Sequence, residues 1–146
     1  MHIVLNSKFF PSLSAPELAV KARELGFDGI DVVVRPGHPV NPANVETALP
    51  QAVMAWKAQG LICPLATAPV TLVTPDAPEG EPLYAGCAAA GVPRVKIGFF
   101  PFTPGQDYWA LVDAARRALE SFARVGETHG VQTVYQVHSG PVLGSN

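Results

Sequence analysis

The sequence is poor in the features that mark secreted, membrane or zinc-binding proteins. Only two of its 146 residues are cysteines, and Cys63 and Cys87 lack the Cys-x-x-Cys or Cys/His spacing of a structural zinc site. We expect both to be small buried residues rather than partners in a disulfide. No apolar stretch reaches the roughly 20 residues that cross a bilayer, and MHIVLNSKFF lacks the basic and apolar regions of a signal peptide. These absences predict a cytoplasmic protein without a membrane partner.

Charge is also scarce. Charged residues make up 15% of the chain, the formal net charge is -2, and Lys and Arg form no runs. A nucleic-acid partner is therefore not expected, because binding to phosphate backbones depends on clustered basic residues. The hydrophobic share is 48% and the mean hydropathy is +0.21. Such values are typical of parallel strands that are buried on both faces.

The most informative pattern in the sequence is a repeated stop between a helical stretch and an apolar run. Four segments share it: ELGFDGIDVVV, AQGLICPLAT, AAGVPRVKIGFF and THGVQTVYQV. In each, a helical stretch stops at a glycine and an apolar run follows at once; the glycines are Gly26, Gly60, Gly91 and Gly130. Glycine readily adopts the left-handed conformation that ends a helix. The glycines lie about thirty to forty residues apart, as successive βα units require.

The helical stretches differ in how clearly they begin and end. The first opens with an S-x-x-E capping box, Ser14 and Glu17, and ends at Gly26. The second is predicted to begin near residues 41–42, to be interrupted or restarted at Pro50, and to end before Gly60. The third should be a short helix after a loop, and the fourth should cover residues 107–129, with its end loosened by Gly126.

The expected strands cover residues 2–6, 29–34, 61–67, 93–99 and 131–137. Two α/β architectures share this order: the N-terminal half of a (β/α)8 TIM barrel and a complete, doubly wound, flavodoxin-like domain. The chain lacks both a fifth helix after the last strand and a glycine-rich phosphate loop after the first, where NSKFFPSLS stands. We therefore favour a half barrel of five parallel strands and four helices, forming one domain over residues 1–146 that is truncated after the fifth strand.

Polar side chains gather where these strands end, which is where parallel α/β folds place their sites. They are Asn6, Lys8, Asp31, Arg35, His38, Thr67, Lys96, Gln136 and His138. Arg35 suits a carboxylate or phosphate, and His38 suits proton transfer from its Pro-Gly turn. A solvated arginine and an ordinary turn histidine are the alternatives. For Asp31 we expect a structural ion pair with Lys96.

The C-terminal pair, Gln136 and His138, stands two residues apart on the last expected strand. Both side chains should therefore point to the same face, toward the barrel lumen. Imidazole is a good metal ligand, whereas an uncharged glutamine carbonyl is a poor one. The pair alone makes no metal site, and a histidine that only hydrogen-bonds at a strand end is the alternative.

Two of these segments together resemble a known family. GFDGID, within LGFDGIDVVVRPGHPVNPANVETALPQAV, is similar to the G-[FY]-D-G-[IV]-[ED] signature of the sugar phosphate isomerase/epimerase superfamily, the xylose isomerase-like TIM barrels. YQVHSG resembles the Y-Q-N-H-S-G-like fifth strand of some members. Val137 departs from that pattern, and RPGHPV is one glycine shorter than the family's V-R-P-G-G-H-V-like loop. The resemblance covers the whole chain but only the first half of the family's barrel.

The resemblance implies a sugar or sugar-phosphate substrate and proton transfer beside a carbonyl, assisted by a divalent metal (Mn, Mg, Co or Zn). Its ligands would come from strands five to eight of the barrel. Gln136 stands where many members carry a glutamate ligand, which puts metal binding by this chain in doubt. On this basis the candidate catalytic residues are His38 and His138, the candidate substrate-binding residues are Arg35, Lys96 and Gln136, and the candidate metal ligand is His138.

A half barrel has consequences of its own. Its two outer strands lack neighbours, so we expect self-association through the exposed sheet edges and no isomerase activity from this chain alone. The alternative function is a non-catalytic module that binds a small molecule or another protein. A nuclease of the related endonuclease IV type would share the fold, but it would need more basic residues than this chain has.

Overall fold

The computed structural model describes residues 1–144 and contains one five-stranded sheet. Its strands are β1 (Val4–Asn6), β2 (Gly29–Val33), β3 (Ile62–Thr67), β4 (Arg94–Lys96) and β5 (Gln132–Val134). Its helices are the 3-10 helix η1 (Ser7–Phe9), α1 (Ala15–Glu24), α2 (Val45–Lys57), α3 (Gly80–Ala90) and α4 (Tyr108–His129). Five strands and four α-helices alternate as the glycine pattern predicts. The expected fourth and fifth strands end three residues too late, because β4 stops at Lys96 and β5 at Val134.

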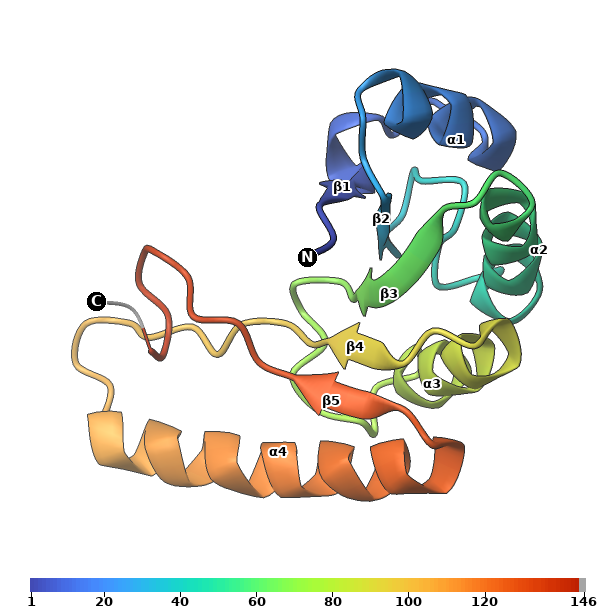
Figure 1. The fold of residues 1–146 in the computed structure, drawn as a ribbon. Helices are drawn as coiled ribbons and strands as arrows, with labels where there is room; N and C mark the ends of the chain where they lie inside the picture. The colour runs from blue at the N-terminus through green and yellow to red at the C-terminus, as the bar shows by residue number, and fades with distance from the viewer. Residues whose placement is uncertain (145–146) are drawn as a thin grey trace.

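Strand order distinguishes the two architectures that the sequence left open. The strands are all parallel and lie in the order β1-β2-β3-β4-β5. A flavodoxin-like domain would instead have the order 2-1-3-4-5, with helices on both faces. Here the helices follow one side of the sheet as an arc (Figure 1). The fold is therefore a partial TIM barrel, and the doubly wound alternative is wrong.

The first helix begins as its capping box predicts. Glu17 accepts a hydrogen bond from the Ser14 backbone N–H at 2.8 Å and another from the Ser14 hydroxyl at 2.6 Å. The helix presents Leu18, Ala19 and Ala22 to the core, where all three are buried. The capping residues mark where the helix begins, and the apolar residues mark which face is buried. Both signals lie in the local sequence.

The second helix differs from the prediction. It begins at Val45, later than expected, and it continues through Pro50 without interruption. An interior proline costs a helix about 3 kcal/mol. Leu49, Val53 and Trp56 are almost completely buried, and burying each side chain of this size contributes about 1.5–3 kcal/mol. Packing of this face outweighs the cost of the proline, so the helix is not broken.

The third helix follows a loop, as predicted, but it is not short, because its 11 residues exceed the 10 of α1. Its Tyr84 hydroxyl lies 2.6 Å from the Thr133 hydroxyl, which ties α3 to β5. Cys87 of this helix and Cys63 of β3 are buried and free, so the prediction of two small buried residues is confirmed. Burial is the main reason that the pKa of each thiol is raised to about 12. Both are therefore protonated, unreactive core residues at neutral pH.

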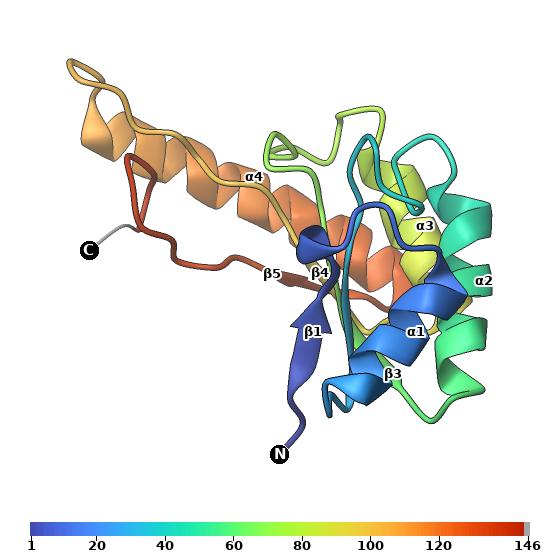
Figure 2. The same ribbon diagram turned by 90° about the horizontal axis from the view of Figure 1, so that it is seen from above.

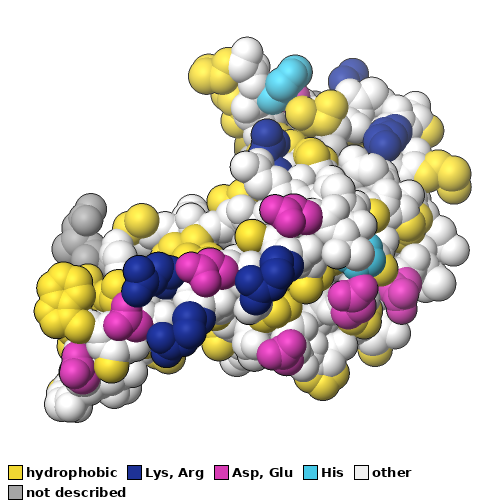
Figure 3. All heavy atoms as spheres, turned by 90° about the horizontal axis from the view of Figure 1, so that it is seen from below, with side chains coloured by type: hydrophobic (Ala, Val, Ile, Leu, Met, Phe, Trp, Pro, Cys, Tyr) yellow, Lys and Arg dark blue, Asp and Glu magenta, His cyan; other side chains and the backbone are white. Residues whose placement is uncertain are grey.

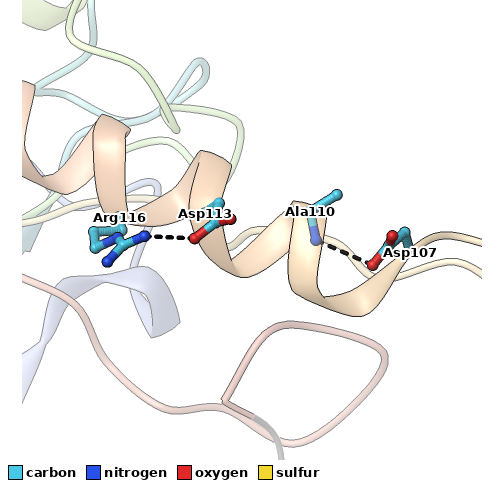
Figure 4. Close-up of polar contacts among 4 residues, drawn as sticks. All are labelled: Asp107, Ala110, Asp113 and Arg116. Atoms are coloured by element: carbon cyan, nitrogen blue, oxygen red, sulfur yellow. Dashed lines mark hydrogen bonds and ion pairs between the residues drawn. The ribbon is translucent and has the colours of Figure 1, made fainter.

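The fourth helix begins at a strong N-cap. The Asp107 carboxylate accepts hydrogen bonds from the backbone N–H groups of Trp109 and Ala110, at 2.8 and 3.1 Å. Figure 4 shows the bond from Ala110. One turn later, Arg116 forms an ion pair with Asp113 at 2.5 Å. Charges of both signs alternate along the outward face of the helix (Figure 3). With the segments before it and after β5, α4 extends beyond the strands (Figures 1 and 2).

Gly126 does not loosen the end of α4, contrary to expectation. The helix continues to His129, and Gly130 then ends it in a left-handed conformation, with φ 66°. A Cβ atom at Gly126 would lie only 2.4 Å from the carbonyl oxygen of Val131. A side chain at this position would therefore push the helix away from the segment entering β5.

The sheet has two open edges within the part of the chain that the structure describes. Among residues 1–144, no other strand pairs with the outer edge of β1 or of β5. Beyond β4 and β5 the chain forms one antiparallel bridge, between Pro101 and Val142. No described helix combines the length and the apolar character that a membrane span needs.

Candidate functional site

The carboxyl ends of the parallel strands surround a small polar hollow of about 80 Å³. Its lining comes from the ends of β1 to β5 and from the segments that follow them: Asn6, Lys8, Arg35, Thr67, Lys96, Phe99, Gln136 and His138. The sequence predicts roles in substrate binding, catalysis, metal binding or ion pairing for six side chains at strand ends. Four of these six side chains line the hollow. These are Arg35, Lys96, Gln136 and His138. The structure thus brings both ends of the chain to one site.

Asp31 lies beside this hollow and joins three strands. Its two carboxylate oxygens accept hydrogen bonds from the Asn6 amide at 2.7 Å and from the Thr67 hydroxyl at 2.8 Å. Burial raises the pKa of Asp31, and those two hydrogen bonds oppose the rise. The expected ion pair with Lys96 is wrong, because neither contact of Asp31 involves Lys96 within the described residues. Neutral donors from β1 and β3 take that place, and sequence reasoning had not assigned them this role.

Lys96 is 5% exposed, which is rare for a lysine. Its Nζ atom lies 4.1 Å from the centre of the Phe99 ring. Burial lowers the pKa of Lys96, the Arg35 guanidinium lowers it further, and Asp31 opposes both effects. The sequence did not identify Phe99 as the partner of Lys96. The available signal is a phenylalanine three residues after a lysine at the end of a strand.

Arg35 is held at the mouth of β2 by a tight turn. His38 donates its backbone N–H to the Arg35 carbonyl at 3.1 Å, with Pro36 and Gly37 between them. Gly37 has φ 82°, which matches the third residue of a type II turn. The Nε atom of Arg35 is buried and has no hydrogen-bond partner in the described structure. The turn therefore holds a residue with an unsatisfied donor in the lining of the hollow.

His38 lies outside the hollow. Its side chain lines a separate, mainly apolar cavity of about 20 Å³ together with Phe10, Val40 and Trp56. Burial, and to a smaller extent Arg35, lowers its pKa. The structure therefore does not bring the two candidate residues of the RPGH turn to the same cavity. The catalytic role predicted for His38 stays a prediction.

Gln136 and His138 follow β5 rather than lie in it, yet both line the hollow, as expected from their spacing. The His138 ring lies 4.8 Å from the Phe99 ring. Its Nδ1 atom is 2.7 Å from the Ser139 carbonyl oxygen. Because a carbonyl oxygen only accepts, Nδ1 carries the proton, and Nε2 of the neutral ring is left as an acceptor.

The described residues do not fit a metal ion by themselves. No group of three or more His, Cys, Asp or Glu side chains converges anywhere in residues 1–144. Among the described residues that line the hollow, His138 is the only such side chain, and Gln136 offers no charge. The arrangement instead offers two lysines and an arginine for binding, and a histidine nitrogen that can accept a proton.

Comparisons with known proteins give matches in structure only. No family model matches the sequence, and no curated protein matches it. The fold is similar to that of a D-psicose 3-epimerase solved with D-fructose present, with a TM-score of 0.68 and 15% identity over all of this chain and 54% of that one. It is also similar to a D-tagatose 3-epimerase-like protein, with a TM-score of 0.71 and 17% identity over 99% of this chain and 56% of that one.

A third similar structure is a 3-keto-D-glucoside 4-epimerase from E. coli, with a TM-score of 0.69 and 16% identity over 92% of this chain and 55% of that one. At such low identities the likeness establishes the fold. The chain spans about half the length of the solved structures that it matches. The prediction of the N-terminal half of a (β/α)8 barrel fold is confirmed in that sense.

Proposed function

We propose that this chain is the N-terminal half of a sugar isomerase or epimerase barrel and that it supplies the part of the active site that binds substrate. The observation that carries the proposal is the polar hollow at the carboxyl ends of all five strands. The fold supports it, because the structural neighbours are named as epimerases of sugars and of a keto-glucoside.

Each residue of the hollow has a task that follows from its chemistry. Arg35 and Lys96 bind oxygen atoms of the substrate through charged donors. Gln136 binds a hydroxyl group through its amide, which can both donate and accept. His138 accepts a proton at Nε2, since Nδ1 is held by the Ser139 carbonyl. The reaction is a proton transfer beside a carbonyl.

His38 is the part of this proposal that a single substitution tests most directly. Its ring lies in the apolar cavity beside the hollow, and its backbone closes the turn that places Arg35. A catalytic role would require contact with substrate, whereas a positioning role would act through that turn. The two roles predict different effects on turnover and stability.

The remaining part of the site would come from three further βα units after β5, those of strands six to eight. A divalent metal, Mn, Mg, Co or Zn, would require ligands from those units, because His138 is a single ligand and Gln136 a weak one. We therefore assign no step of the reaction to a metal held by this chain. Residues 1–146 alone should lack isomerase activity.

Deuterium exchange gives a direct test. The chain and a longer protein that continues its reading frame through strand eight would each be incubated with D-fructose, D-allulose or a ketose phosphate in D2O. Proton NMR then measures loss of the signal at the carbon beside the carbonyl. We expect exchange by the longer protein with divalent metal, and none by the 146-residue chain.

Two controls make the result interpretable. His138→Gln in the longer protein should abolish exchange while circular dichroism stays unchanged, because the substitution removes the proton acceptor from an exposed position. Arg117→Gln, on the exposed face of α4, should leave exchange unchanged. A reading frame that stops at residue 146, or a longer protein that binds sugars without exchange, would instead support the non-catalytic binding module.

A further inference from the structure

Three cations face the hollow, and the described acidic residues leave them largely uncompensated. Lys8 comes from η1 after β1, Arg35 from the mouth of β2 and Lys96 from β4, and no carboxylate is among the lining residues. Asp31 is the one acid close enough to affect the pKa of Lys96. Three positive charges therefore converge beside one carboxylate.

That carboxylate is already engaged. Both oxygens of Asp31 accept hydrogen bonds from neutral partners, Asn6 and Thr67. Within residues 1–144 none of the ion pairs involves Lys8, Arg35 or Lys96. The two lysines instead lie over aromatic rings, Lys8 at 4.8 Å from the centre of Phe9 and Lys96 at 4.1 Å from that of Phe99. The three cations thus repel one another, with Asp31 as the one nearby opposite charge and without an ion pair of their own within residues 1–144.

Arg35 provides a second, independent sign of a missing group. Its Nε atom is buried and unpartnered, although buried donors are nearly always hydrogen-bonded. A guanidinium is matched best by two oxygen atoms of a carboxylate or phosphate, which accept from Nε and a terminal nitrogen together. An oxyanion in the hollow would satisfy this donor and relieve the repulsion between the three cations at once.

We propose that the hollow binds an anionic group of the substrate, so that the enzyme acts on an acidic sugar, carrying a carboxylate or a phosphate, rather than on a neutral ketose. This inference rests on the proposed function. It differs from the neutral sugar D-fructose that accompanies one structural neighbour. A neutral sugar would bind through hydrogen bonds alone and would leave three converging cations with Asp31 as their one nearby counter-charge. The rest of the sugar would extend toward Gln136 and His138, which line the same hollow.

The site can be tested on the 146-residue chain, because Lys8, Arg35 and Lys96 all belong to it. Calorimetric titration with inorganic phosphate at low ionic strength should show one site per chain. Lys96→Met and Arg35→Gln should each weaken phosphate binding at least tenfold. Lys8→Gln should weaken it less, because Lys8 is exposed, and this variant serves as the test if the Lys96 variant fails to fold.

Arg117→Gln is the matched control, since it removes the same charge from an exposed position on α4. Phosphate binding that falls equally in this variant would show only general attraction to positive charge and would overturn the proposal. The absence of any phosphate binding by the folded chain would overturn it as well.

Competition identifies the source of the anion. D-fructose 6-phosphate, D-glucuronate and D-fructose would each be titrated against bound phosphate. Stronger displacement by the phosphate ester supports a sugar phosphate, and stronger displacement by glucuronate supports a sugar acid. Displacement by D-fructose as effective as by either charged sugar would refute the inference. Deuterium exchange with neutral ketoses by the longer protein would still support the proposed function. Phosphate binding without exchange on any sugar would refute the proposed function and leave the anion site intact.

Discussion

Gly126 lies in the last turn of α4, where general helix propensity and this particular structure predict opposite effects of one substitution. Alanine is favoured over glycine inside a helix by about 0.8–1.0 kcal/mol, so Gly126→Ala should stabilise an ordinary helix. Here the new Cβ would lie 2.4 Å from the Val131 carbonyl oxygen, although ordinary contacts between non-bonded carbon and oxygen are longer by roughly 1 Å. The helix and β5 would have to separate.

The cost of that separation can be set against the gain in propensity. Inserting one carbon into a packed contact costs about 1–3 kcal/mol. The displacement also strains the hydrogen bond from the Val131 N–H to the Gly126 carbonyl, which is 2.9 Å long, and such a bond contributes about 0.5–1.5 kcal/mol. After subtracting the propensity gain, Gly126→Ala should destabilise the chain by about 1–3 kcal/mol.

Urea and thermal denaturation, followed by circular dichroism, measure this change. Glu127→Ala is the matched control, because Glu127 is the exposed neighbour in the same turn and should change stability by about 0.5 kcal/mol or less. An equal or higher melting temperature for Gly126→Ala would refute the reasoning. It would mean that the contact between α4 and β5 relaxes freely.

Three further predictions concern the site and the sheet edges. Asp31→Ala should lower stability by about 2–4 kcal/mol at pH 7, because it leaves the Asn6 amide and the Thr67 hydroxyl without their acceptor. Burial raises the pKa of Asp31 above 3.8, so the folded wild type binds a proton more readily than the unfolded chain does. The difference in free energy of unfolding between wild type and variant should therefore grow as pH falls through the folded pKa. A constant difference in urea titrations across that range would contradict this. His38→Ala in the longer protein should lower turnover at least tenfold and shift the melting temperature little, and a lower melting temperature with full turnover would assign the ring to packing. The chain should self-associate through the outer edges of β1 and β5, so light scattering after size exclusion should give a mass above that of one chain, and a cooperatively melting monomer would contradict this expectation.

Much of the fold was predictable because its signals are local. A glycine that ends a helix needs only its own backbone conformation, and all four predicted stops, including Gly26 and Gly130, have φ between 66° and 78°. The capping box of Ser14 and Glu17 spans one helical turn. The alternation of helices and strands follows from these signals together with the apolar runs between them.

The strand order does not follow from local signals, so the sequence left two architectures open. Each helix that follows a strand can carry the chain to either side of the existing sheet, and both choices use the same residues for turns and caps. The order is decided by which helix faces pack together, and here the helices stay on one side. The helix through Pro50 was also not predictable from local sequence. The burial of Leu49 and Trp56 outweighs the cost of a proline inside a helix, and this burial exists only in the folded chain.

The sequence by itself determined that polar residues stand at the strand ends, since each lies next to an apolar run. Only the tertiary structure decided which of them meet. It gave Asp31 the partners Asn6 and Thr67 in place of Lys96, placed His38 in a separate apolar cavity, and brought Lys8 and Arg35 into the hollow with Lys96. The physical reason is that a strand fixes the spacing of its own side chains, whereas contacts between strands depend on the stagger and curvature of the whole sheet.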